Sequence, residues 1–339
     1  MSDSVCCNSP RGGSFKLLGV GSPLLDVLVQ VDEAFLQTVP GEKGGMLMVD
    51  ADFQQAILDR LPGEPRRVPG GSAGNTVFAL ARLGVDVSMF GKLGSDANGD
   101  FYRARLVELG GSDAAFVTTG ESPTGTCLAM ITPDAERTMR SSLAASLLLR
   151  PEEAEQIDFS QFDMVYIEGY MFYSAVMPTV MLRAKAAGCR IGIDLASFEV
   201  VRDFREDLPD ILRNYVDIVI GNEEEAAALF TGLPLETQLE RLASWCDIAA
   251  IKLGRRGAVV RRADETVRVP AQLVENPVDT TAAGDLWAAG FLYGVVTGKM
   301  LAEAAWYGAL LSGEVVKVVG SEIPEPVWDE IRRKLKIDG

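Results

Sequence analysis

Short apolar runs alternate with amphipathic runs through the second half of the chain. The apolar runs are rich in Val, Ile and Ala, and the runs between them carry apolar residues at helical spacing. Such alternation is typical of a mostly parallel sheet with helices on both faces, so we predict an α/β fold. The predicted strands are Met164–Glu168, Arg190–Asp194, Ile218–Ile220 and Ile248–Lys252, and the helices include Ala175–Ala187, Glu223–Phe230 and Leu239–Trp245.

The first half of the chain has a less regular pattern. A strand is predicted at Phe15–Val20 and another at Val85–Phe90, and helical spacing appears at Ala51–Leu61, Thr76–Gly84 and Phe101–Leu109. Shorter β-rich segments do not fit this alternation, and we expect them to form a small sheet apart from the main core. These segments are Leu25–Val31, Gly45–Val49, Ala115–Thr118 and Thr126–Ile131. No internal repeat or interdomain linker is visible.

A turn of small residues precedes the most apolar predicted helix. Asn276-Pro-Val-Asp-Thr-Thr-Ala-Ala-Gly-Asp285 is followed by apolar positions at helical spacing from Leu286 to Val296. Bare backbone N–H groups at such a helix start would form an anion pocket, in which Asp285 could remove a proton from a hydroxyl group. The alternative is a capped, buried helix whose small residues permit close packing, and the stretch by itself leaves both interpretations open.

Composition narrows the classes of function. The chain has 339 residues, of which 47% are hydrophobic, enough for a large core with a small appendage. Lys and Arg number 32 and Asp and Glu number 48, so the net charge is 32 − 48 = −16, which disfavours nucleic-acid binding. There is no histidine, which excludes Ser-His-Asp and Cys-His catalysis and histidine metal ligands.

The cysteines and the N-terminus indicate a cellular compartment. The five cysteines form no Cys-x-x-Cys pair, and reduced thiols in a cytoplasmic protein are expected. We predict a flexible polar tail at residues 1–14, and no stretch has the length and apolarity of a membrane span.

Three stretches look like known motifs but do not meet the requirements of the sites that those motifs form. Gly19-Val-Gly-Ser-Pro-Leu24 lacks the third glycine of a dinucleotide site, and Pro23 blocks an immediate helix. Gly70-Gly-Ser-Ala-Gly74 matches a nucleophile elbow, but without histidine a glycine turn that approaches a ligand fits better. Gly294 to Lys299 has the wrong spacing for a phosphate-binding loop.

The stretch Asp279-Thr-Thr-Ala-Ala-Gly-Asp285, with Gly290 and Phe291 after it, resembles the C-terminal signature of the ribokinase-like (PfkB-type) sugar and nucleoside kinases. That signature usually reads Asp-Thr-x-Gly-Ala-Gly-Asp, and here Ala282 replaces the first glycine, as in some ribokinases of the family. The resemblance covers nearly all of the chain after Phe15. It implies a three-layer α/β core over residues 15–339 with a small β-sheet lid from segments about 22–50 and 112–140.

The resemblance also implies roles for individual residues. Asp285 would be the general base, and the backbone of Ala282, Ala283 and Gly284 would be the anion hole. Asn222-Glu-Glu-Glu225 resembles the family's Asn-x-x-Glu element, although Asn222 is also a good N-cap for the next helix. The element implies that Asn222 and Glu225 serve the nucleotide phosphates, with Glu225 holding Mg²⁺ through water. A family glycine loop beside the nucleotide falls on Lys252, Gly254 and Gly257, where a plain hairpin is the alternative.

The front half resembles the adenosine-kinase branch of the family. On this basis the acceptor would contact Asp26, Gly70, Gly71 and Asn75, and Arg137 would contact phosphate. A turn aspartate and an exposed surface arginine are the alternatives for Asp26 and Arg137. Asp279 and the Thr281 carbonyl resemble the positions at which several members hold a monovalent cation, so K⁺ is a candidate activator.

These residues imply an ATP- and Mg²⁺-dependent kinase acting on a primary hydroxyl group. The predicted lid has few basic residues and several Met and aliphatic residues, which favours a purine nucleoside, adenosine first, over a phosphorylated sugar. Arg66 and Arg67 beside the glycine pair have no assigned role. The alternatives are a ribokinase-type sugar kinase and, third, a sensor that binds a nucleoside or sugar without catalysis. We expect no nucleic-acid or membrane partner, and a monomer or a lid-mediated homodimer.

Overall fold

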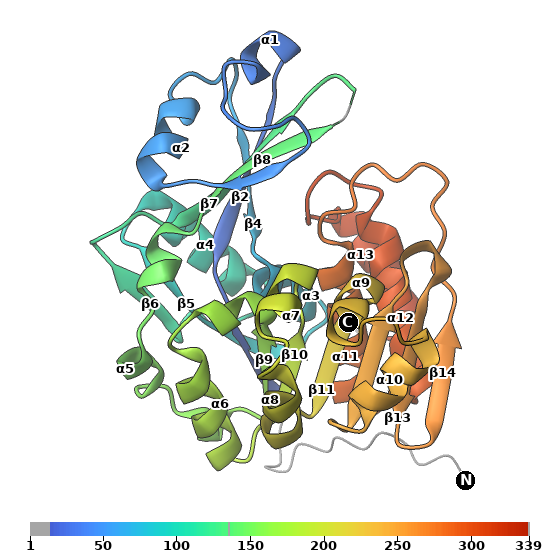
Figure 1. The fold of residues 1–339 in the computed structure, drawn as a ribbon. Helices are drawn as coiled ribbons and strands as arrows, with labels where there is room; N and C mark the ends of the chain where they lie inside the picture. Colours follow the sequence, from blue (N-terminus) through green and yellow to red (C-terminus); the bar gives the residue numbers. More distant parts are fainter. Residues whose placement is uncertain (1–13, 135, 338–339) are drawn as a thin grey trace.

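The computed structural model describes residues 14–134 and 136–337. The tail predicted at residues 1–14 lies, apart from Ser14, outside these described residues. Within them, a large sheet is covered by helices on both faces and a smaller sheet stands at one end (Figure 1). No helix of this described part combines the length and apolarity that a membrane crossing requires.

Nine strands within the described residues form the large sheet. Neighbours from β12 through β9 and β1 to β6 run parallel, whereas β13 and β14 form antiparallel additions at one edge. In spatial order they are β14 (Glu265–Val269), β13 (Ala258–Arg262), β12 (Ile248–Lys252), β11 (Ile218–Asn222), β10 (Arg190–Asp194), β9 (Met164–Glu168), β1 (Lys16–Val20), β5 (Asp86–Gly94) and β6 (Phe116–Thr119).

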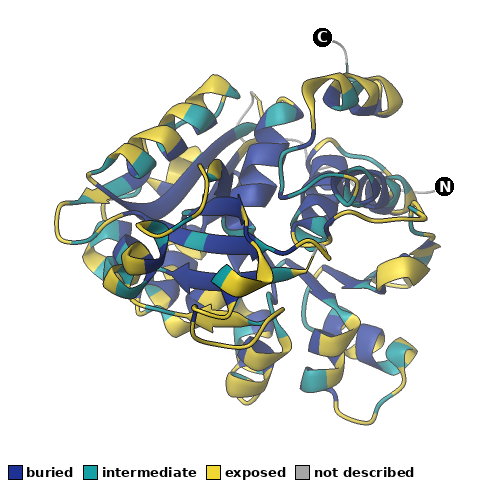
Figure 2. Cartoon of the chain, turned by 90° about the horizontal axis from the view of Figure 1, so that it is seen from above, coloured by how far each residue is buried: buried dark blue, intermediate teal, exposed yellow. Residues whose placement is uncertain are grey.

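Alternate residues of the central strands face two separate apolar cores. Tyr166 and Ile220 join the core formed with one helical layer, while Val165 and Val219 join the other. This alternation follows from the two-residue period of a strand and produces three layers. The first layer contains α3 (Ser72–Arg82), α4 (Ala97–Glu108), α11 (Ala283–Val296), α12 (Leu301–Val315) and α13 (Glu325–Leu335). The second contains α5 (Pro151–Ala154), α6 (Met177–Ala186), α7 (Phe198–Asp203), α8 (Leu208–Tyr215), α9 (Glu223–Leu229) and α10 (Leu235–Ala243). Figure 2 shows buried residues concentrated in the central strands and exposed residues on the outer helices.

Five strands within the described residues form the lid sheet. Its outer face packs on α1 (Glu33–Leu36) and α2 (Ala51–Leu58); in Figure 1, α1 lies above the lid strands and α2 to their left. Its inner face, which includes Asp26, turns toward the large sheet. In order the strands are β3 (Met46–Met48), β8 (Arg137–Ser142), β7 (Gly125–Ile131), β2 (Leu24–Gln30) and β4 (Arg66–Gly70).

Strands β6 and β4 are among the elements that differ from the sequence-based expectation. The β-rich segment Ala115–Thr118, expected in the small sheet, forms β6 and pairs with the end of β5 at the edge of the large sheet. Periodicity identifies a strand but does not choose its partner, and the α4 crossover returns the chain to the large sheet. Strand β4 was not predicted because it contains Pro69, which is tolerated at a sheet edge.

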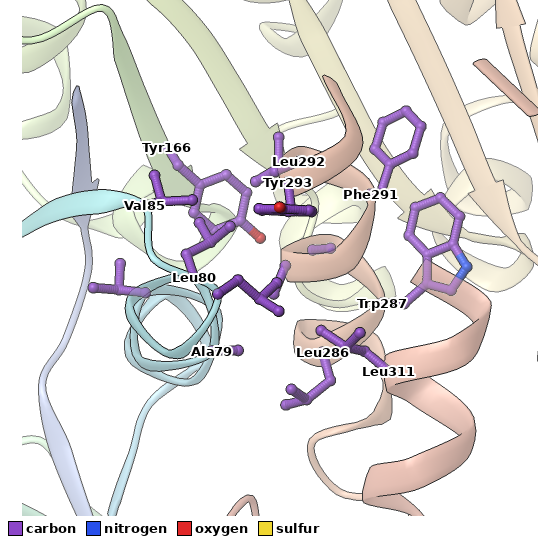
Figure 3. Close-up of a cluster of buried hydrophobic side chains, with 14 of the residues drawn as sticks. Ala79, Leu80, Val85, Tyr166, Leu286, Trp287, Phe291, Leu292, Tyr293 and Leu311 are labelled. Carbon is purple, nitrogen blue, oxygen red and sulfur yellow. The ribbon is translucent and has the colours of Figure 1, made fainter. Parts of the chain in front are cut away.

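Helices α3 and α11 lie side by side behind the candidate site. Figure 3 shows Leu80 of α3 and Leu292 of α11 in the same buried cluster as Tyr166 of β9. This packing fixes the N-terminal ends of the two helices relative to each other, and both ends carry predicted site residues.

Candidate active site

Polar and charged residues end four neighbouring parallel strands, and two of them, Asn222 and Lys252, were predicted for the site. Glu168 ends β9, Asp194 ends β10, Asn222 ends β11 and Lys252 ends β12. In open α/β sheets this edge is where ligands bind, because strand ends and helix N-termini meet there.

The start of α11 provides backbone donors. Ala282 is the N-cap and has no side-chain hydrogen bond, and the Ala283 N–H donates to the Thr280 carbonyl at 3.2 Å. Within residues 14–134 and 136–337, the N–H groups of Ala282 and Gly284 have no hydrogen-bond partner. Ala282 has a φ of −95°, which any residue can adopt, so replacing glycine there causes no strain. Of the three amides predicted to form the anion hole, those of Ala282 and Gly284 are therefore unpaired and that of Ala283 is paired within the turn.

Asp285 points away from its own helix start and toward α3. Its Oδ1 accepts a hydrogen bond from Ser72 Oγ at 2.8 Å, and its Oδ2 accepts one from Asn75 Nδ2 at 2.8 Å. Burial raises the pKa of Asp285 to about 7; Asp194 adds to this, while the two hydrogen bonds and Lys252 oppose it. A carboxylate with this pKa is suited to act as a base near neutral pH, and it does not serve as the helix cap.

The residues predicted to bind the acceptor lie beside this base. Asp26 is 8% exposed, and burial raises its pKa to about 6, with Arg137 opposing and Asp279 adding to the shift. A Cβ atom on Gly70 would lie 2.7 Å from Asp26 Oδ1, and one on Gly71 (φ 84°) would lie 2.4 Å from the Ser22 carbonyl. Both glycines therefore permit the close approach between the start of lid strand β2, with Ser22 before it, and the start of α3.

A cavity of about 360 Å³ opens next to these residues. It lies between the lid and the segment after β9, and Glu168 is the one charged residue among the described residues that line it. Its walls include exposed apolar side chains, which suits an uncharged, flat ligand better than a phosphorylated one. They include Met46, Met48, Leu147, Tyr170 and Tyr173.

Two buried acidic residues at the site were not predicted from the sequence. Glu168 accepts hydrogen bonds from the N–H groups of Ser22 and Ala73 at 2.8 and 2.9 Å. It thereby joins the segment before lid strand β2 to α3. Burial raises the pKa of Glu168, although these N–H groups favour its charged form. Asp194 accepts a hydrogen bond from Lys252 Nζ at 2.8 Å. An acidic residue ending an apolar strand of a parallel sheet was the available signal for both.

Asn222 and Glu225 bind each other. Asn222 Oδ1 accepts from the Glu224 and Glu225 N–H groups at 2.9 Å, and Glu225 accepts from the N–H and Nδ2 of Asn222 at 2.8 and 2.7 Å. This is a capping box at the start of α9, as the structural alternative expected. Burial, and then the charge of Asp194, raises the pKa of Glu225 to about 7, with Lys252 opposing.

A second cavity, of about 240 Å³, lies beside α11 on the far side from the lid. Gly254 and Gly257 line it together with Ala283 and Trp287. Gly257 has a φ of 92°, and a Cβ there would lie 1.9 Å from the Val269 carbonyl, so the hairpin itself requires this glycine. The cavity reaches Thr280 and Ala283 at the start of α11 and has the apolar lining that a nucleotide base would need.

Arg137 links the lid to the loop before α11. It forms an ion pair with Asp279 and donates to Thr281 Oγ1 at 2.6 Å. Burial opposes ionisation of Asp279, but hydrogen bonds from Thr281 and the Gly320 N–H, together with Arg137, hold its pKa below the usual value. Donors already occupy both Asp279 oxygens, so a K⁺ ion at Asp279 and the Thr281 carbonyl would have to displace some of them, and the K⁺ site stays a prediction.

Comparison with known proteins finds one matching kinase family and several similar kinases. The model of the pfkB family carbohydrate kinases matches residues 44–328. The crystal structure of adenosine kinase from Sinorhizobium meliloti is similar with a TM-score of 0.83 and 32% identity, covering 95% of this chain and 100% of that one. Adenosine kinase from Saccharomyces cerevisiae is 28% identical over 340 residues, or 91% of this chain and 96% of that protein. An ATP-dependent ribose-1-phosphate kinase from Halopiger xanaduensis is 31% identical over 271 residues, or 76% and 87%.

Proposed function

This chain belongs to the pfkB family of carbohydrate kinases, and from that premise we propose that it phosphorylates the primary hydroxyl group of a purine nucleoside, adenosine first. The family uses ATP, which supplies the transferred γ-phosphoryl group. The observation that carries the proposal is Asp285: a buried carboxylate with a pKa of about 7 beside unpaired helix N–H groups. That pairing of a base with an anion hole suits phosphoryl transfer to a hydroxyl group.

Different residues of the site have different roles in the proposed reaction. Asp26, Gly71 and Asn75 orient the acceptor, Asp285 takes the proton from its hydroxyl group, and the Ala282 and Gly284 amides hold the transferring oxygens. Most of the rate enhancement in phosphoryl transfer comes from such positioning and charge stabilisation. When Arg137 leaves Asp279 and binds the phosphate instead, it adds positive charge to the site from the lid side.

The charge of the site supports a divalent cation that arrives with the nucleotide. Asp194, Glu225 and Asp285 surround the single ammonium group of Lys252, which leaves an excess of carboxylate oxygens. No ready cluster of three or more acidic, Cys or His ligands exists within residues 14–134 and 136–337. Mg²⁺ commonly keeps several waters and binds through one or two carboxylates plus phosphates, so Glu225 would act through water.

A sugar acceptor is the second candidate. The similarity to the ribose-1-phosphate kinase of Halopiger xanaduensis favours it, and so does the Ala282-Ala283-Gly284 sequence. The described residues that line the cavity of about 360 Å³ include no basic residue, which argues against a phosphorylated sugar.

An acceptor panel tests the proposal. We expect kcat/KM for adenosine to exceed that for ribose and ribose 1-phosphate, because the apolar cavity wall matches a flat base. In parallel, Asp285→Asn should lower kcat by roughly 10² to 10⁴, the usual contribution of a general base, with ATP binding nearly unchanged. A sugar preferred by an order of magnitude would replace the nucleoside assignment, and a fully active, folded Asp285→Asn protein would remove the base.

A further inference from the structure

Lys252 lies under the first turn of α11. Its side chain crosses the end of β11 from β12 to reach Asp194 on β10, with 2.8 Å between Nζ and Oδ2. A Cβ atom built on Gly284 would lie 3.2 Å from Lys252 Nζ. The ammonium group therefore occupies the space that the glycine leaves open, next to a residue whose own N–H is unpaired.

The Lys252–Asp194 pair is mostly removed from water. The two side chains are 14% and 5% exposed. Burial works against the charged form of Lys252, but the carboxylates of Asp194 and Glu225 outweigh it and raise its pKa, so the ammonium stays charged. A buried ion pair is often no more stable than an apolar pair of the same volume, so fold stability by itself does not explain it.

The ammonium group also has unused donors. Lysine carries three N–H groups, and within residues 14–134 and 136–337 its one hydrogen bond is to Asp194. The remaining N–H groups lie near Gly284, at the positive start of α11. An anionic oxygen bound to the Gly284 N–H would therefore also lie within reach of Lys252.

We propose that Lys252 is a catalytic residue that donates a hydrogen bond to the transferring phosphoryl group, and that Asp194 is the positioning residue that holds it there. This inference rests on the proposed function. In the step itself, the bond from phosphorus to the ADP oxygen breaks, the bond to the acceptor oxygen forms, and the acceptor proton goes to Asp285. Lys252 keeps its protons throughout and stabilises the charge that is spread over the phosphoryl oxygens.

The first test compares ligand affinities rather than turnover. Lys252→Met should weaken binding of ADP with aluminium fluoride, a mimic of the transferring phosphoryl group, by roughly 10² or more, while binding of ADP alone stays nearly unchanged. Lys252→Arg keeps the charge and should retain part of the affinity. Equal affinity of wild type and Lys252→Met for the aluminium fluoride complex would overturn the proposal.

Turnover provides the second test, with a control for folding. Lys252→Met should lower kcat by roughly 10² to 10³, as loss of one preorganised donor does. Because this variant leaves Asp194 buried and unpaired, the double variant Lys252→Met/Asp194→Asn removes both charges. The double variant should stay as slow as Lys252→Met; recovery to the wild-type rate would show that the ammonium only supports the fold.

The role of Asp194 has its own readout. Asp194→Asn removes the carboxylate that raises the pKa of Lys252, so the alkaline limit of kcat should move to lower pH. An unchanged pH profile would contradict positioning by Asp194. If the wild type phosphorylates no acceptor, the proposed function fails, whereas the comparison of ADP with its aluminium fluoride complex still decides the role of Lys252.

Discussion

The position of Asp285 in the fold makes the charged form of its side chain energetically unfavourable. An ionised carboxylate buried against α3 loses its hydration, and two hydrogen bonds only partly replace it. The same burial that gives Asp285 the raised pKa of the proposed base therefore makes its charged form destabilising. Function and stability oppose each other at this residue.

The pH dependence of stability measures that cost. The pKa of Asp285 is about 7 in the folded protein against an ordinary value of 3.8, so between these values the folded state binds more protons and stability falls as pH rises. The stability of Asp285→Asn relative to wild type should thus increase from pH 5 to pH 7 and level off above, by roughly 2–8 °C in Tm. Thermal melts of both proteins across this range provide the measurement. A Tm difference that does not change with pH would contradict the raised pKa.

At the scale of elements, α11 uses glycine for two different reasons. A Cβ on Gly290 would lie 2.4 Å from the Tyr307 backbone carbonyl of α12, whereas a Cβ on Gly284 would meet only the end of the Lys252 side chain at 3.2 Å. Backbone cannot move aside as a flexible side chain can. Gly290 therefore permits the packing of α11 on α12, whereas Gly284 leaves space for Lys252 in the proposed site, although both lie in one helix.

The same substitution at these two glycines should give opposite results. Gly290→Ala should destabilise the protein by about 1–3 kcal/mol through overpacking. Gly284→Ala should keep or raise Tm, because alanine favours a helix by about 1 kcal/mol over glycine, yet lower kcat by displacing Lys252. Thermal melts and initial rates of the two variants check this pair. A stable, fully active Gly284→Ala protein would show that the space beside Lys252 has no function.

At the scale of the whole molecule, ion pairs connect the lid to the core. Arg137 and Asp279 have side chains that are 13% and 4% exposed, while Arg66 and Glu322, also between lid and core, are 55% and 29% exposed. Exposed pairs contribute little, but removing one partner of a buried pair leaves an uncompensated charge. We infer that the Arg137 contact controls how readily the lid opens.

Hydrogen exchange tests the lid contact. Arg137→Gln should cost about 3–5 kcal/mol at the lid–core contact and speed deuterium uptake in β8 and β2. Arg66→Gln is the matched control at an exposed pair and should cost about 0–1 kcal/mol with unchanged uptake. Equal uptake in the two variants would mean that Arg137 does not hold the lid.

The sequence determined the local elements and the chemistry at their ends. Strands Met164–Glu168, Arg190–Asp194 and Ile248–Lys252 have the predicted bounds, because short apolar runs between helical segments leave little choice of period. The stretch ending in Asp285 was identifiable since its small residues and carboxylate are contiguous in the chain, and the family resemblance it carried is confirmed.

Only the tertiary structure decided which residues meet. Periodicity placed a strand near Ala115 but not its partner, so β6 was expected in the lid and lies in the large sheet. Glu168 and Asp194 carry no motif of their own, and the motif around Ser72 indicated only a glycine turn. These residues matter because parallel strands and two helix starts bring them to one edge. The pKa of Asp285 likewise depends on burial by α3, which is distant in sequence, and such contacts between distant segments leave no local pattern in the chain.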